Sequence, residues 1–222
     1  MSAGEQEAPP EKALRDEFAP RKVLQRETVY EGLVWDVVRD TVDLGGEGGV
    51  VKREYVQHTG AVAILALDED GRVLLIEQYR HPVGMTLWEL PAGLLDVEGE
   101  EPLDAAKREL AEEADLRADR WHVLADWFNS PGGMTEALRL YLARDLVPVP
   151  ETERHQREAE EHGMVTRWVP LHEAREAVLA GALHNPAAVV GILAACEGSA
   201  QDWRRLRPGD SPWPEHPLYR NR

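Results

Sequence analysis

Two glutamates, Glu109 and Glu113, stand four residues apart in the segment LDAAKRELAEEADL. On a helix this spacing places both side chains on one face. Both would border an apolar stripe at helical spacing, which consists of Leu103, Ala106, Leu110 and Ala114. Two carboxylates held beside buried surface repel each other. A divalent cation such as Mg²⁺, which binds carboxylates, water and phosphate oxygens, would remove that repulsion.

Helix geometry alone leaves an alternative open, because the sequence KRELAEE is also typical of a solvent-exposed face with salt bridges. Glu112 lies farther round the same helix, from where it could join a cation site through a water molecule or a second ion. The helix is predicted over residues 102–114, with Pro102 in its first turn, where proline is tolerated. The segment therefore predicts either a metal-binding helix or an acidic surface helix.

Strands and helices around this segment must position it. Apolar patterning predicts strands near 119–128, 138–146 and 165–169, and helices near 171–180 and 186–196. Residues 61–80 predict a hairpin of two largely buried strands around the turn DEDG, and residues 81–100 predict a loop. The order of elements indicates mixed layers of the α/β (α+β) class rather than a doubly wound parallel sheet.

Composition divides the chain into four parts. Residues 1–20 are rich in Glu, Ala and Pro and predict a disordered tail. Residues 21–58 predict an antiparallel β extension, with a hairpin turn at the glycine cluster Gly45–Gly49. Residues 59–197 are predicted to form the core domain. Residues 198–222 predict an irregular, proline-rich tail, whose tryptophans cover an apolar patch, cover a dimer partner, or lie in a plain tail.

The composition also limits the class of partner. A formal net charge of −16 argues against binding of nucleic acid or an anionic membrane. A phosphorylated small molecule remains compatible when divalent cations lie between its phosphates and the carboxylates. The chain has no run of eighteen apolar residues and begins with polar, acidic residues, so we expect a soluble, cytoplasmic protein. The single cysteine, Cys196, can form no internal disulfide and is interpreted as a small core residue.

The segment from Gly93 to Leu116 resembles the Nudix box, in which Gly, five residues, Glu and seven residues precede Arg-Glu-apolar-x-Glu-Glu-x-Gly-apolar. Every charged position from Glu100 to Glu113 matches. Six residues instead of five separate Gly93 from Glu100, and Asp115 replaces the last glycine, where Asp tolerates a left-handed conformation better than most residues. With WELPAG and the strand order, the resemblance covers most of residues 22–196. It implies a Nudix-like α/β/α sandwich with a mixed sheet, plus the N-terminal antiparallel β extension.

The resemblance implies a hydrolase that attacks phosphorus in a nucleoside diphosphate linked to another group, with Mg²⁺ or Mn²⁺ as cofactor. The metals would neutralise the diphosphate, lower the pKa of a bound water and stabilise charge on the leaving phosphate. Arg108 would orient the glutamates by ion pairing, and Glu100 would support the junction of loop and helix. The implied metal ligands are the carboxylates of Glu109 and Glu113, Glu112 as ligand or water holder, and the Ala92 carbonyl.

A general base would be either a metal-bound hydroxide or a carboxylate from the loop ETERHQREAEEHGM, residues 151–164. By the same resemblance Glu161 is the first candidate for the catalytic base and Glu160 the second. The alternative is a solvated acidic loop, because loops of this length and polarity commonly lie at the surface.

Three features resemble the ADP-ribose pyrophosphatase branch of the family, whose members hydrolyse ADP-ribose to AMP and ribose 5-phosphate. They are the extension, segments such as VKREYVQHTGAVAIL and IEQYRHPVG, and Pro131, sixteen positions after Asp115. In this branch the extension builds a homodimer and part of the substrate pocket. The implied substrate-binding residues are Trp35, stacked on adenine, Arg53 and Arg80, bonded to phosphate or ribose oxygens, and Gly93 and Pro131.

Each of these assignments has an alternative. Trp35 could instead be strand core, and either arginine could be a surface or interface residue. His58 and His81 are interpreted as pocket-wall or loop residues rather than metal ligands. A Nudix hydrolase of another nucleotide sugar, such as GDP-mannose, or of a dinucleotide would carry the same box. A non-catalytic Nudix-fold binding module would be expected to have altered box glutamates or an added DNA-binding domain, and the sequence has neither.

Overall fold

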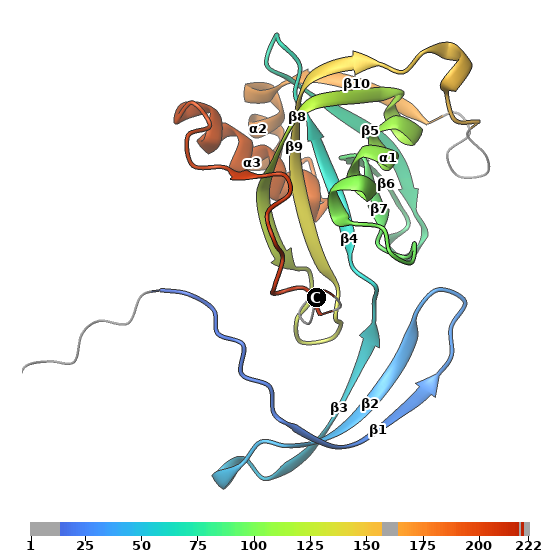
Figure 1. Cartoon of the computed structure of the whole chain (residues 1–222), viewed down its shortest axis with the longest axis vertical. Coiled ribbons are helices and arrows are strands. Elements are labelled where there is room, and N and C mark those ends of the chain that lie inside the picture. Colours follow the sequence, from blue (N-terminus) through green and yellow to red (C-terminus); the bar gives the residue numbers. More distant parts are fainter. Residues whose placement is uncertain (1–13, 157–163, 218, 220–222) are drawn as a thin grey trace, which may run out of the picture.

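The computed structural model describes residues 14–156, 164–217 and 219. It begins with an extension of three antiparallel strands that lies apart from the main body (Figure 1). The strands are β1 (Lys22–Tyr30), β2 (Asp36–Asp43) and β3 (Val50–Gln57). A short 3₁₀ turn, Gly46–Gly48, connects β2 to β3, so the predicted hairpin turn at the glycine cluster is confirmed.

The main body contains two sheets. A five-stranded mixed sheet has the order β11-β8-β9-β4-β7, in which β4 and β9 are parallel and the other neighbours are antiparallel. A three-stranded sheet has the order β10-β5-β6. The bounds are β4 Ala61–Ala66, β5 Arg72–Arg80, β6 Met85–Glu89, β7 Ala92–Leu94, β8 Leu116–Phe128, β9 Ala137–Pro148, β10 Val165–Pro170 and β11 Arg207–Pro208.

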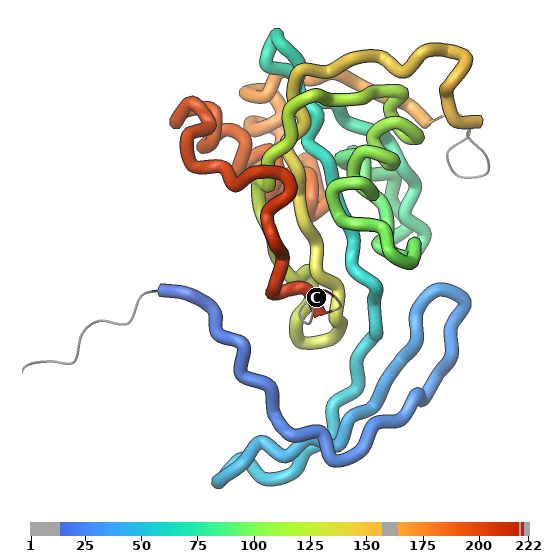
Figure 2. Tube along the Cα trace, in the orientation of Figure 1, coloured from blue at the N-terminus to red at the C-terminus, as the bar shows by residue number. Residues whose placement is uncertain are grey.

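Strand β4 lies at the centre of the core, and all six of its residues are buried. Because side chains alternate along a strand, Ala63 and Leu65 join the apolar cluster formed with α2 (Leu171–Leu179) and α3 (Pro186–Ala200). Val62 and Ile64 join the opposite cluster, formed with α1 (Pro102–Ala114). The sheets therefore lie between α1 on one side and α2 and α3 on the other (Figure 2), which confirms the predicted α/β/α sandwich.

The predicted hairpin over residues 61–80 is wrong in its strand pairing. Its two strands are buried as expected, but β4 pairs with β9 and β7, whereas β5 pairs with β10 and β6. Only a single bridge, Leu67 to Val73, joins them beside the tight turn. Strands that are apolar on both faces find partners on both edges, and local sequence does not specify which. The predicted loop over residues 81–100 is also wrong in part, because it contains β6 and β7.

The other predicted strands and helices are confirmed within a few residues at each end. After α3 the chain forms β11, which pairs with β8, and then buries Trp213 at 5% exposure in the cluster beside α1. Of the roles left open for the tail, Trp213 thus covers an apolar patch. Cys196 is half-buried and unbridged, and burial raises the pKa of its thiol.

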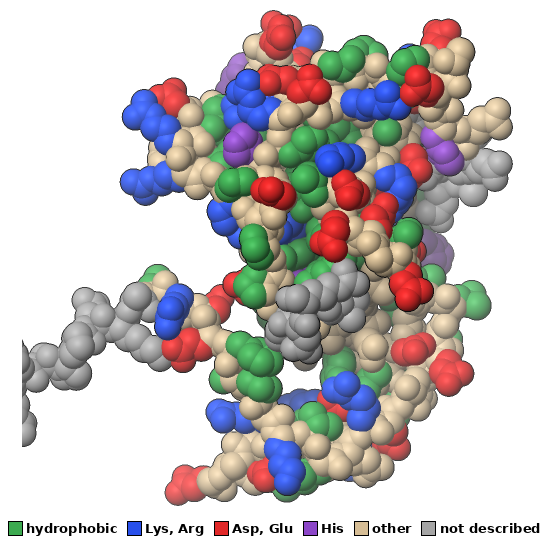
Figure 3. Space-filling model, viewed as in Figure 1, with side chains coloured by type: hydrophobic (Ala, Val, Ile, Leu, Met, Phe, Trp, Pro, Cys, Tyr) green, Lys and Arg blue, Asp and Glu red, His purple; other side chains and the backbone are tan. Residues whose placement is uncertain are grey.

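Strand β1 presents side chains that are exposed along its whole length. Hydrophobic side chains lie on the surface of the extension in the view of Figure 3, and those exposed on β1 include Val23, Leu24, Val29 and Tyr30.

No helix in the described ranges combines the length and the apolar character needed to cross a membrane.

Candidate active site

Helix α1 is fixed at both ends by its sequence. Pro102 occupies its first turn, and Asp115 caps its C-terminus in the left-handed conformation, with φ 53° and ψ 35°. The Asp115 N–H donates to the Leu110 carbonyl. Asp therefore adopts the backbone conformation that glycine adopts most easily, as the sequence predicted. Ala106 and Leu110 are fully buried, which sets the rotation of the helix.

This rotation brings Glu113 into the body of the protein. Glu113 is only 6% exposed, and its Oε2 accepts a hydrogen bond of 2.9 Å from the Ala92 N–H. A charge-assisted hydrogen bond to backbone compensates part of the cost of burying a carboxylate. The bond ties α1 to β7 at the point where the sequence predicted a loop.

Glu109 lies one helical turn earlier, with its side chain 12% exposed, and packs against Gly93. A Cβ added to Gly93 would overlap the Glu109 carboxylate, so only glycine permits this approach of backbone to side chain. The structure therefore brings together four of the residues that the sequence singled out: Ala92, Gly93, Glu109 and Glu113.

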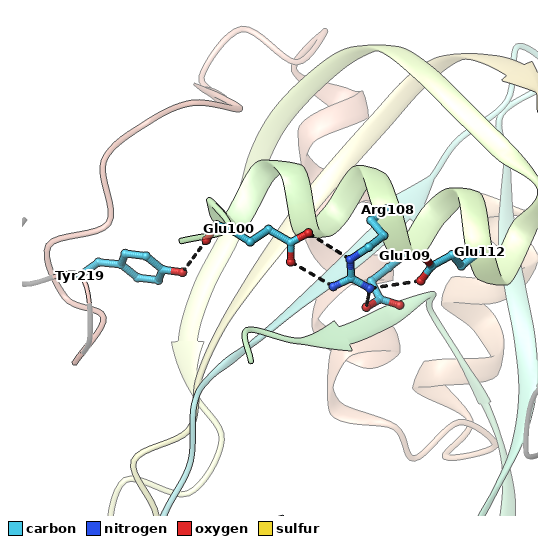
Figure 4. Close-up of polar contacts among 5 residues, drawn as sticks. All are labelled: Glu100, Arg108, Glu109, Glu112 and Tyr219. Carbon is cyan, nitrogen blue, oxygen red and sulfur yellow. Dashed lines mark hydrogen bonds and ion pairs between the residues drawn. The ribbon is translucent and has the colours of Figure 1, made fainter. Parts of the chain in front are cut away.

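Arg108 joins Glu100, Glu109 and Glu112 into one network (Figure 4). Its guanidinium donates two 3.0 Å hydrogen bonds to the Glu100 carboxylate, one of 2.6 Å to Glu109 and one of 3.1 Å to Glu112. Hydrogen bonding to Glu100 is the main factor that raises the pKa of Arg108, while burial acts in the opposite direction. One permanent positive charge thus contacts three carboxylates, and the cluster remains electronegative.

The donors of this cluster suit a hard divalent cation. No group of three or more His, Cys, Asp or Glu side chains in residues 14–156, 164–217 and 219 already converges as a cation site. However, Mg²⁺ is usually held by only one or two carboxylates together with water and substrate phosphate oxygens. Glu109 lies in a cradle that a Cβ at Gly93 would fill, and Glu113 lies on the same helix face. The residues present therefore fit Mg²⁺ or Mn²⁺.

A cavity of about 380 Å³ opens beside this backbone, and its lining includes Ala92, Gly93 and Leu94 of β7. Trp35 reaches it from the extension and stacks on His58, with ring centroids 5.1 Å apart and an interplanar angle of 27°. Trp35 lies in the turn before β2 and is 44% exposed. The alternative that Trp35 is strand core is therefore wrong.

Arg80 also lines this cavity. Its guanidinium forms a two-pronged ion pair with Glu89, at 2.8 and 2.6 Å, and Glu89 is only 1% exposed. Arg53, by contrast, is exposed on β3 and donates to the Lys52 carbonyl, and it does not line this cavity. The structure thus brings one of the two predicted arginines to the cavity.

Pro131 lies exposed in the turn between β8 and β9, outside the lining itself. Other residues near it in the chain, Asn129, Met134 and Glu136, line the cavity. Glu160 and Glu161, the candidate bases, lie outside the described residues.

Three polar residues of the cavity wall were not selected from the sequence. Asn129 accepts from Trp127 Nε1 at 2.6 Å and donates to Glu136 at 2.7 Å. Glu136 in turn lies 3.8 Å from His58 Nε2. Glu89 is the third, held by Arg80. Glu136 is the last residue of the segment SPGGMTE, which also contains Pro131. Its nearness to Pro131 in the sequence was therefore a signal for a cavity residue.

His58 should make stability depend on pH. Its Nδ1 accepts a 2.9 Å hydrogen bond from the Gly60 N–H, which protonation would break. Burial lowers the pKa of His58, while Glu136 acts in the opposite direction. The unfolded chain therefore binds the extra proton first, so this stability is present above the ordinary histidine pKa of about 6.5 and is lost as the pH falls below it.

We expect acidification from about pH 7.5 to about pH 5.5 to lower the free energy of unfolding more in the unmodified protein than in His58→Gln. Glutamine keeps an acceptor for Gly60 but takes up no proton. Urea denaturation at the two pH values measures the difference. Equal pH dependence in both proteins would show that His58 titrates alike in the folded and unfolded states.

Comparison with known proteins identifies the family of this chain. The family model of the NUDIX domain matches residues 57–189, more than half of the chain. The chain belongs to the Nudix family. It is 43% identical to an ADP-ribose pyrophosphatase of Mycobacterium tuberculosis (strain ATCC 25618 / H37Rv). The 196 aligned residues are 88% of this chain and 92% of that protein.

One further relative and one solved structure are also similar to this chain. An ADP-ribose pyrophosphatase of Bacillus subtilis (strain 168) is 37% identical over 130 residues, which are 59% of this chain and 69% of that protein. A solved structure described as an ADP compounds hydrolase superposes with a TM-score of 0.67 at 20% identity. It covers 86% of this chain and all of that one, and at this identity the likeness shows the Nudix fold alone.

Proposed function

We propose that this Nudix protein hydrolyses the diphosphate of ADP-ribose to AMP and ribose 5-phosphate. The observation that carries the proposal is the pair Glu109 and Glu113, which is fixed against the backbone of Ala92 and Gly93. These two backbone residues line a cavity of about 380 Å³. The similarity to the Mycobacterium tuberculosis ADP-ribose pyrophosphatase over 88% of the chain supports this substrate.

Mg²⁺ or Mn²⁺ is the cofactor that we propose for this site. Glu109 and Glu113 would hold it, with Glu112 as ligand or water holder and the Ala92 carbonyl as a backbone ligand. When bound, the cation supplies positive charge to the diphosphate and to the leaving phosphate. The chain's own residues keep the carboxylates in place: Arg108 contacts Glu109 and Glu112, and the Ala92 N–H binds Glu113.

The cavity residues suggest how the two ends of the substrate are bound. Trp35 would stack on adenine, since its exposed ring lines the cavity. Arg80 would donate to phosphate or ribose oxygens while Glu89 fixes its orientation. Arg53, Gly93 and Pro131 stay predictions for the remaining contacts.

Glu161, and after it Glu160, stays the predicted general base. Both lie in the acidic loop 151–164, outside the part of the chain that the structure describes. Cytoplasmic location and the disordered tail over residues 1–20 likewise stay predictions from the sequence.

We further propose that residues 21–58 join two copies of the chain and contribute to the pocket. The support is the fully exposed strand β1, whose surface carries the apolar side chains of Val23, Leu24 and Val29. An apolar surface of this kind on a sheet is typical of a protein interface. Sedimentation equilibrium should give twice the chain mass of 24.9 kDa, and a monomer at micromolar concentration would contradict the proposal.

The substrate is tested by incubating the protein with ADP-ribose, GDP-mannose and a diadenosine diphosphate, each with Mg²⁺ and each with excess chelator. Chromatography should show AMP and ribose 5-phosphate from ADP-ribose, in the presence of Mg²⁺ and not with chelator. Faster turnover of GDP-mannose or the dinucleotide would support another substrate. No product from any compound, with either Mg²⁺ or Mn²⁺, would favour a non-catalytic binding module.

A further inference from the structure

The C-terminal segment, described over residues 207–217 and 219, is anchored along the same face of the body as α1. Its first residues form β11 on the edge of β8. Arg139, which is buried, then donates to the backbone carbonyls of Ser211, at 2.6 Å, and Pro212, at 3.2 Å. The Arg139 guanidinium also lies 4.6 Å from the centre of the Trp213 ring. The segment is therefore fixed to the scaffold rather than lying loosely on it.

His216 packs against Gly60, which directly precedes β4, the strand that pairs with β7. It is buried, with its ring centroid 4.5 Å from that of Trp213 and 4.7 Å from that of Tyr219. Its Nε2 occupies the space that a Cβ on Gly60 would fill, and Gly60 has a φ of +93°. The Gly60 carbonyl accepts from the Leu95 N–H at 3.0 Å, just after β7. The His216 ring thus packs beside the Gly60 backbone, which holds the end of β7.

Tyr219 then reaches the loop that directly precedes α1. Its hydroxyl donates a 3.2 Å hydrogen bond to the backbone carbonyl of Glu100, and the Glu100 carboxylate holds Arg108 (Figure 4). Glu100 follows the exposed residues 96–99, so little core packing fixes this end of the loop. A cavity of about 410 Å³ separates residues 101–104 from residues 209–213 of the segment, and the tyrosine reaches the junction of loop and helix beside it.

We propose that Tyr219 is a positioning residue for the carboxylate network of α1. By fixing the backbone of Glu100, it fixes the carboxylate that orients Arg108, and through Arg108 the carboxylates of Glu109 and Glu112. Without this bond Glu100 moves, and Arg108 spends more time paired with the glutamates that would bind the cation. The inference rests on the proposed metal-dependent hydrolysis and adds to it a residue about a hundred positions beyond the Nudix box.

Mn²⁺ binding, followed by electron paramagnetic resonance of the free ion, tests the proposal without any turnover. In Tyr219→Phe, which removes only the hydroxyl, Mn²⁺ affinity should fall about two- to tenfold, the scale of one net hydrogen bond. Tyr79→Phe is the matched control, because Tyr79 is exposed on β5 and its hydroxyl lies 3.5 Å from His81; its Mn²⁺ affinity should be unchanged. Thermal unfolding of both variants should stay close to that of the unmodified protein.

The Glu100→Gln background separates positioning from a general structural effect. Glu100→Gln breaks the ion pair itself and should weaken Mn²⁺ binding more than Tyr219→Phe. Adding Tyr219→Phe to it should then change the affinity little, because the route from Tyr219 to Arg108 is already broken. Unchanged Mn²⁺ affinity in Tyr219→Phe alone, or effects that simply add, would overturn the inference while the proposed function stands. Failure of the unmodified protein to bind Mn²⁺ would overturn both.

Discussion

Replacing Glu113 with glutamine should lower kcat for ADP-ribose by about 10²- to 10³-fold, which corresponds to roughly 3–4 kcal/mol of lost charge stabilisation. Glutamine has nearly the same shape, and its amide oxygen can still accept the hydrogen bond that Ala92 donates to Glu113 at 2.9 Å. The change therefore removes the charge while it leaves the packing of α1 on β7 intact. Steady-state release of AMP in saturating Mg²⁺ measures the loss.

Asp104→Asn is the matched control for this variant. It removes one negative charge from the same helix, but Asp104 is exposed and pairs with Lys107 across one helical turn, an interaction of little energy. Its kcat should stay within a factor of about two of the unmodified protein, and both variants should unfold at similar urea concentrations. Near-normal turnover in Glu113→Gln would remove Glu113 from the mechanism.

The part of this site that lies on one helix was predictable from the sequence. Helical spacing puts Glu109 and Glu113 on one face, the apolar stripe decides that this face borders the core, and Asp115 ends the helix in the left-handed conformation. Each of these inferences depends on residues within a few turns of one another. Local geometry therefore sufficed for the carboxylate helix.

The partners of that helix were not predictable in the same way, because they come from distant segments. Residues 61–80 have the apolar runs and tight turn of a hairpin, yet β4 and β5 join different sheets. Pairing is decided by which buried strand edges are available in the assembled body. Strand β7 is only three residues long and owes its extended conformation to pairing with β4. Tyr219 and Glu100, 119 positions apart, carry no sequence pattern that would have joined them.

Replacing Gly93 with alanine should have the second large effect. The added methyl group would overlap the Glu109 carboxylate, so either Glu109 rotates away or β7 shifts. Gly93 does not have a positive φ, so alanine adopts the same backbone without strain. A displacement of about 1 Å at a catalytic centre can cost about 10²-fold in rate, and overpacking typically costs about 1–3 kcal/mol of stability. AMP release and urea denaturation measure the two effects.

The variant Glu109→Ala decides whether this overlap is the cause. Without the Glu109 carboxylate the new methyl group has room, so Gly93→Ala should lower the free energy of unfolding by less in that background than in the unmodified protein. The coupling between the two changes should reach about 1–2 kcal/mol, as for residues in direct contact. Additive losses of stability would mean that Gly93 and Glu109 do not touch in solution. In that case the backbone of β7 would not be what holds the Glu109 carboxylate beside Glu113.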